Sequence, residues 1–198
     1  LFDTAPKDFN TVSVFSGNAF SGVDRVSDAH QITAGVTTRV LEPTSGVEAL
    51  RLGVAQRYLL RDQQVTPDGV PLTQRFSDLL LDGTAQLTSR WAFHAALQYS
   101  PEIDRTTRSV LSARYTPGPL RTLAASYRLA RGASEYLDLG WQWPVYRGAA
   151  ADNGQNGSAC RGTLYSVGRI NYSTKDNTVT DSLAGFEYDA GCWIGRVV

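Results

Sequence analysis

Apolar residues recur at every second position along most of this chain, and this period of two constrains the fold more than any other feature. In residues 31–40, for example, one set of alternate positions is largely apolar, whereas the other set holds Gln, Thr, Gly and Arg. Such alternation is typical of β-strands, and no stretch keeps a helical period for long. The sequence therefore predicts an all-β chain of roughly ten strands, at 31–40, 49–60, 79–87, 91–99, 111–115, 123–129, 137–143, 164–172, 179–189 and 192–198.

Turn-forming residues separate these strands. Turns are expected at 89–90, 117–119 and 174–177, since the two prolines at 117 and 119 cannot donate hydrogen bonds to a strand ladder. The small and polar run 149–158 is expected to be a loop. Pro144 is expected to close a strand that ends in two tryptophans.

Two kinds of protein fit this alternation. Several strands reach the length of about 9–11 residues that crosses a membrane, their apolar faces have Trp or Tyr near the ends, and their other faces suit a wet lumen. A water-soluble sandwich, such as one that binds carbohydrate, has the same alternation with the apolar face turned inward. The period alone leaves both open.

The amino-acid composition narrows the range of functions expected for this chain. The 19 acidic residues balance the 19 basic residues, so nothing indicates a nucleic-acid partner. The chain has no Met and no signal peptide at its start, which we interpret as a mature or excised segment. Two cysteines are too few for a disulfide scaffold or a metal cluster. The two histidines lack the motifs of known hydrolases, so we expect no catalytic residues, no metal and no cofactor.

Three segments resemble a known family. They are FSGNAFSGVDRVSDAHQ with the strand after it (residues 15–40), VEALRLGVAQRY (47–58), and the stretch 169–193 that ends in SLAGFEYDAGCW. In this order they are similar to the C-terminal barrel region of the LptD family, the outer-membrane lipopolysaccharide-assembly proteins. The rival interpretations are another outer-membrane barrel, such as a porin or siderophore receptor, and the soluble sandwich.

The resemblance implies an antiparallel up-and-down β-barrel in the outer membrane of a Gram-negative bacterium that is not an enzyme. The family works with an LptE-like plug lipoprotein. It receives lipopolysaccharide from periplasmic Lpt bridge components through an N-terminal jellyroll, and it contacts outer-membrane lipid. Residues 1–198 would then be a partial C-terminal barrel domain, without the jellyroll and the early strands.

The resemblance also assigns a role to Cys192. Many family members have adjacent cysteines at this turn, and they bond to the N-terminal region. Gly191 stands where the first of the pair would be. An inter-domain disulfide is therefore implied for Cys192, and a bond to Cys160 or an inert thiol are the alternatives.

The remaining candidate residues are polar. We expect five arginines on the luminal faces, where they contact phosphorylated lipid or pair with acidic residues across strands: Arg39, Arg51, Arg57, Arg114 and Arg128. A well-ordered loop is expected around Asp24, Arg25 and Asp28, with Arg25 paired to one of the two aspartates. The simpler interpretation of this loop is a turn whose Gly and Asp residues set the backbone geometry.

Overall fold

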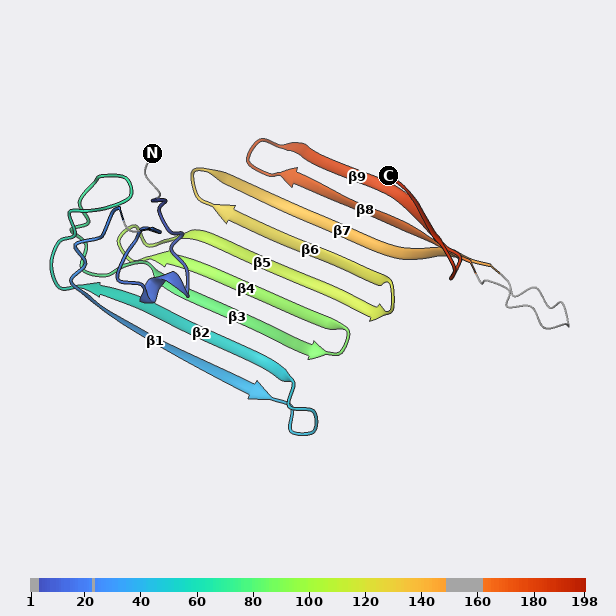
Figure 1. Cartoon of the computed structure of the whole chain (residues 1–198), viewed down its shortest axis with the longest axis horizontal. Helices are drawn as coiled ribbons and strands as arrows, with labels where there is room; N and C mark the ends of the chain where they lie inside the picture. The colour runs from blue at the N-terminus through green and yellow to red at the C-terminus, as the bar shows by residue number, and fades with distance from the viewer. Residues whose placement is uncertain (1–3, 23, 149–161) are drawn as a thin grey trace, which may run out of the picture. The chain divides into compact units, whose positions relative to one another are not determined.

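The structure, a computed structural model, describes residues 4–22, 24–148 and 162–198. In these residues ten antiparallel strands follow one another up and down in a single sheet, in chain order (Figure 1). The strands are β1 Gln31–Leu41, β2 Glu48–Leu59, β3 Leu79–Thr88, β4 Trp91–Ser100, β5 Arg105–Gly118, β6 Arg121–Ala130, β7 Ser134–Arg147, β8 Thr163–Ser173, β9 Thr178–Asp189 and β10 Ile194–Val197. The predicted all-β, up-and-down fold is confirmed.

The only helical element of the described residues is the single turn η1, Ser13–Phe15. No helix among these residues has the length and apolar character needed to cross a membrane.

Two strands continue through prolines at which the sequence predicted that they would end. β5 runs through Pro117, so the turn predicted at 117–119 lies one to two residues later, where Leu120 has a φ of 54°. Thr116 N–H donates to the carbonyl oxygen of Arg90 at 2.7 Å. The N–H groups of consecutive strand residues point to opposite neighbouring strands, so position 117 is on the β6 side of β5. It lies next to the turn between β5 and β6, where the lack of an N–H is tolerated.

Pro144 does not close its strand either. β7 continues to Arg147, and its register with β8 shifts between Pro144 and Tyr146. A bulge leaves a residue out of the ladder, and this is where a strand tolerates a proline.

The chain divides into two compact units, and the division passes through β3, β4 and β5. The first unit comprises residues 1–85 and 94–110. Its β1–β2 register pairs Gln31 with Leu59 and Val40 with Leu50. Directly paired residues share a face of the sheet, so this register defines an apolar face and a polar face.

The apolar face of the first unit is exposed. Ile32 lies opposite Tyr58 and Val36 lies opposite Val54, and all four side chains are exposed, Val36 to 70%. The buried apolar cluster lies on the other side, where Ala55 and Leu80 are paired and contact Val14. In this unit, the side chains of the apolar face are exposed, whereas the buried apolar cluster lies on the polar face.

The second unit comprises residues 86–93 and 111–198 and repeats this division. On its apolar face Leu139 lies opposite Ile170, and both side chains are exposed. Trp141 lies opposite Gly168, and its indole N–H donates to the Ser166 hydroxyl at 3.1 Å. On the polar face a row of directly paired residues crosses four strands, namely Ser126, Asp138, Asn171 and Asp181.

Candidate functional site: the polar face

The N-terminal loop, residues 4–22, lies on the polar face of the first unit (Figure 1). An isolated bridge pairs Pro6 with Phe20 and closes the loop. Two backbone hydrogen bonds accompany it, from Lys7 N–H to Ala19 at 2.8 Å and from Ser21 N–H to Ala5 at 2.9 Å. Two apolar side chains of this compact loop, Val14 and Phe20, are buried.

Arg57 on β2 connects the sheet to this loop. Its Nη2 atom donates to three backbone carbonyl oxygens, those of Val14 at 2.5 Å, Ser16 at 3.2 Å and Ser13 at 3.4 Å. Hydrogen bonds from a charged guanidinium are stronger than those from a neutral donor, so Arg57 is a suitable partner for these carbonyls. The guanidinium also lies 5.5 Å from the ring centroid of Phe9.

The start of β1 supplies two more contacts to the loop. Thr33 Oγ1 donates to the Val14 carbonyl at 3.1 Å, and Gln31 Nε2 donates to the Ser16 carbonyl at 3.3 Å. The Phe15 ring lies so close to Gly35 that a Cβ atom there would be 2.8 Å from Cζ. Glycine at position 35 therefore makes room for the loop.

Residues 24–30 contact the loop that joins β2 to β3, at residues 60–78. The Asp28 carboxylate accepts hydrogen bonds from the N–H groups of Gln64 at 3.0 Å and Val65 at 2.9 Å. These donors stabilise the charged form and lower the pKa of Asp28 below its usual 3.8. Arg25 donates to the Thr66 carbonyl at 2.8 Å and lies over the Phe20 ring.

The pairing of Arg25 with Asp24 or Asp28 stays a prediction. The three predicted loop residues, Asp24, Arg25 and Asp28, lie between the N-terminal loop and β1. Sequence reasoning did not find the partners of Arg25 and Asp28, because Thr66, Gln64 and Val65 lie about forty residues away in the chain and belong to no motif.

The other predicted arginines have varied surroundings. Arg39 lies 3.5 Å from Glu48 and directly opposite Arg51. Arg51 lies next to Thr84 of β3 on its other side. Arg114 lies on β5 and is exposed. Arg39 and Arg51 are thus brought together across one ladder, where two like charges repel each other.

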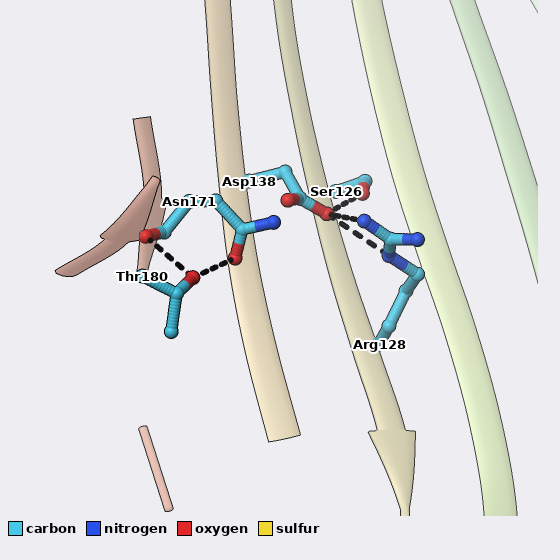
Figure 2. A network of polar contacts seen from close by, with 5 residues as sticks. All are labelled: Ser126, Arg128, Asp138, Asn171 and Thr180. Atoms are coloured by element: carbon cyan, nitrogen blue, oxygen red, sulfur yellow. Dashed lines mark hydrogen bonds and ion pairs between the residues drawn. The ribbon is translucent and has the colours of Figure 1, made fainter. Parts of the chain in front are cut away.

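The fifth predicted arginine, Arg128, belongs to the polar row of the second unit. Figure 2 shows its guanidinium on the Asp138 carboxylate, with Nε 2.9 Å from Oδ2. The Ser126 hydroxyl donates to the same oxygen at 3.1 Å. Farther along, Thr180 Oγ1 donates to the side-chain oxygen of Asn171 at 3.0 Å (Figure 2). The row therefore presents polar groups whose charges are largely neutralised.

Sequence reasoning missed a buried carboxylate at the end of the chain. Glu187 on β9 is 4% exposed, and Arg196 of β10 lies directly opposite, with Nε 2.7 Å from Oε2. Gln142 Nε2 lies 3.4 Å from Oε1. The sequence offered only one sign of this ion pair, namely that a glutamate and an arginine lie on the last two predicted strands.

Two further carboxylates with polar partners, those of Asp78 and Asp82, lie in the first unit. Asp78 accepts from Gln98 Nε2 at 2.7 Å and from the Thr107 hydroxyl at 3.1 Å. Asp82 lies 3.2 Å from His94 Nε2. Within the described parts of the chain, no group of three or more His, Cys, Asp and Glu side chains is suited to holding a metal ion.

Cys192 lies in the turn between β9 and β10, next to Gly191, whose φ is 82°. Its side chain is exposed, with Sγ 3.8 Å from the Ala190 carbonyl oxygen. Cys160 lies outside the described residues. The disulfide of Cys192 stays a prediction.

An antiparallel up-and-down sheet with an exposed apolar face and a hydrogen-bonded polar face is typical of the wall of a membrane barrel. The family model described as "LPS transport system D", LptD, matches residues 1–148. The chain belongs to the LptD family, and the predicted family is confirmed. This membership disfavours the porin-like, receptor-like and sandwich alternatives.

Similar proteins support this membership over the whole chain. "LPS-assembly protein LptD" of Acidovorax sp. (strain JS42) is 45% identical over 205 residues, which cover 100% of this chain and 25% of that protein. The proteins of the same name from Burkholderia pseudomallei (strain K96243) and Aromatoleum aromaticum are 37% and 36% identical and cover 98% and 99% of this chain. This chain spans about a quarter of the length of these relatives.

Proposed function

We propose that this chain forms part of the wall of an outer-membrane β-barrel that inserts lipopolysaccharide into the outer leaflet. The observation that carries the proposal is the exposed apolar face of both units, with Val36 and Leu139 as examples. Water-soluble proteins rarely expose large contiguous apolar patches, whereas a lipid-facing wall requires them. The family membership supplies the cargo, since the relatives are named LPS-assembly proteins.

In this proposal the chain has a structural and not an enzymatic role. Its strands close a wall whose backbone groups are paired, because unpaired groups cannot face lipid. The polar row at Ser126, Asp138 and Asn171 borders the lumen, where it meets sugar or an LptE-like plug lipoprotein. Periplasmic Lpt bridge components act through an N-terminal domain outside this chain, and Cys192 links barrel and domain.

Two adjacent residues on opposite faces provide the test. Leu52 lies on the apolar face, whereas Arg51 lies on the polar face, and both are exposed. We expect Leu52→Arg in the full-length protein to reduce membrane insertion strongly, because a charge in the lipid-facing band costs about 2–4 kcal/mol. Arg51→Leu should insert normally. The measurement is the amount of heat-modifiable protein in outer-membrane fractions, and equal effects of both changes would contradict the proposal.

A further inference from the structure

A pocket of about 480 Å³ lies in the first unit, between the N-terminal loop and the start of β1. The loop contributes Phe15 and Gly17 to its lining, and β1 contributes Gln31 and Thr33. Sites for small molecules usually have volumes of about 300–1,000 Å³. The pocket is therefore large enough for a ligand of several polar groups, and one compact unit supplies the whole lining.

The lining is polar but almost uncharged. The described residues that line the pocket include no Asp, Glu, Lys or Arg, and His30 is the only titratable one. Thr33 Oγ1 donates to the Val14 carbonyl at 3.1 Å, and its lone pairs can still accept hydrogen bonds. A phosphate or carboxylate of a ligand would find no Lys or Arg in this lining to pair with. The pocket therefore favours a neutral ligand that is rich in hydroxyl groups.

Gln31 has a buried oxygen that calls for a donor. Its Nε2 atom donates to the Ser16 carbonyl at 3.3 Å, which determines how the amide is oriented. Oε1 is buried and accepts no hydrogen bond from any described residue. Because buried polar groups nearly always have a partner, this oxygen indicates a donor from outside the protein. A hydroxyl group of a ligand would be such a donor.

Phe15 adds an apolar surface to this polar lining. One edge of its ring lies against the sheet, since a Cβ atom at Gly35 would be 2.8 Å from Cζ, yet the residue is 57% exposed. The face of an aromatic ring has partial negative charge and attracts the slightly positive C–H groups of a neighbour. A sugar ring presents C–H groups on one face and hydroxyl groups around its rim. The combination of Phe15 and Gln31 is suited to both.

We propose that this pocket binds a neutral sugar unit, with Phe15 packed against the sugar ring and Gln31 Oε1 accepting a hydrogen bond from a sugar hydroxyl. The site rests on the proposed function, in which the sugar belongs to the lipopolysaccharide that passes the polar face. It gives that function a defined contact and a preference for sugars without phosphate or carboxylate groups.

The first test fills the pocket. Gly17 borders open space, because a Cβ atom there would meet nothing within 4 Å, and the same holds for Gly118 at the end of β5. The purified full-length protein in detergent micelles is titrated with the core oligosaccharide released from lipopolysaccharide by mild acid, and saturation-transfer NMR measures its affinity. Gly17→Leu should abolish binding, whereas Gly118→Leu should not. Equal affinity of the two variants would overturn the site.

The second test removes one contact and decides the question even if Gly17→Leu fails to assemble. Gln31→Leu should weaken binding of the oligosaccharide by up to about tenfold, the loss of one hydrogen bond. Gln56→Leu is the matched control, because Gln56 Nε2 also donates to a backbone carbonyl, that of Ser77 at 3.1 Å, but Gln56 does not line the pocket. Unchanged affinity in Gln31→Leu would contradict the contact.

Two further probes identify the part of lipopolysaccharide that is bound. The oligosaccharide without its phosphates should bind as tightly as the phosphorylated form, and any binding of lipid A should be insensitive to Gly17→Leu. Loss of affinity on removal of the phosphates would overturn the preference for neutral sugar. Failure of the barrel proposal is a different result, because it would appear as normal insertion of Leu52→Arg and would leave the sugar titration unaffected.

Discussion

Among single residues, several carboxylates of the polar face are paired with side chains of neighbouring strands. Glu187 is the clearest case, because its carboxylate is almost fully buried while Arg196 and Gln142 supply donors. A buried charge that loses its partner destabilises a protein far more than an exposed one. Arg169 and Asp181 also pair, at 2.7 Å, but their side chains are 66% and 49% exposed.

We therefore expect Arg196→Ala to destabilise the folded barrel by about 1.5–3 kcal/mol, the range for a hydrogen bond to a charged group, since Arg196 itself is exposed. Arg169→Ala should cost less than about 1 kcal/mol, as exposed ion pairs do. Comparison of urea midpoints for the two variants of the full-length protein checks this. Equal midpoints would mean that the Glu187 site is not buried in the assembled protein.

Asp28 should make the contact with the 60–78 loop sensitive to acid. Its pKa is lowered by the N–H groups of Gln64 and Val65, so its contribution is complete above the unfolded pKa and is lost as the pH falls through the lower, folded pKa. An environment-sensitive dye at Val70→Cys should report a rigid loop at neutral pH and a mobile loop only after the pH has fallen below 3.8, the usual pKa of the carboxyl group. Asp28→Asn should remove this transition, and a transition that persists in Asp28→Asn would have another origin.

At the scale of elements, glycine positions show where strands and side chains approach each other. A Cβ at Gly168 would lie 2.4 Å from the Trp141 ring and 2.7 Å from the Leu183 carbonyl oxygen. At Gly140, on the neighbouring strand, the nearest atom would be 3.9 Å away. Trp141 thus covers Gly168 on the apolar face.

Gly168→Val should consequently displace Trp141 and strain β8 against β9, at a cost of about 1–3 kcal/mol for overpacking. Gly140→Ala should be tolerated. Steady-state amounts of assembled protein in the outer membrane check the pair. A fully assembled Gly168→Val protein would contradict the close contact.

Much of the sheet could be predicted from the sequence, because the period of two is a local property of each strand. The β1 range differs from its prediction by one residue at one end, and the β8 range differs by one residue at each end. Pro117 and Pro144 misled the prediction, since a sequence does not reveal which N–H groups the ladder leaves out. The polar partners of Arg57 and Asp28 could not be predicted either, because they are backbone groups brought close only by folding.

At the scale of the whole molecule, the chain is about a quarter of the length of its relatives, so its link to the remainder matters. Cys192 is the predicted covalent link. If the predicted inter-domain disulfide forms, Cys192→Ser in the full-length protein should change mobility in a non-reducing gel. Cys160→Ser should leave the mobility unchanged. A shift in Cys160→Ser with the same pattern as Cys192→Ser would indicate that the two cysteines bond to each other instead.

In the proposed barrel wall, the exposed apolar face contacts lipid and the polar face borders the lumen. Three consecutive positions of β7 test this arrangement most directly, namely Leu137, Asp138 and Leu139, with spin labels attached in turn to the full-length protein in liposomes. Labels at 137 and 139 should be accessible to oxygen, which concentrates in lipid, and the label at 138 should be accessible to a water-soluble nickel chelate. Accessibility that does not alternate, or that alternates in the opposite sense, would contradict the account.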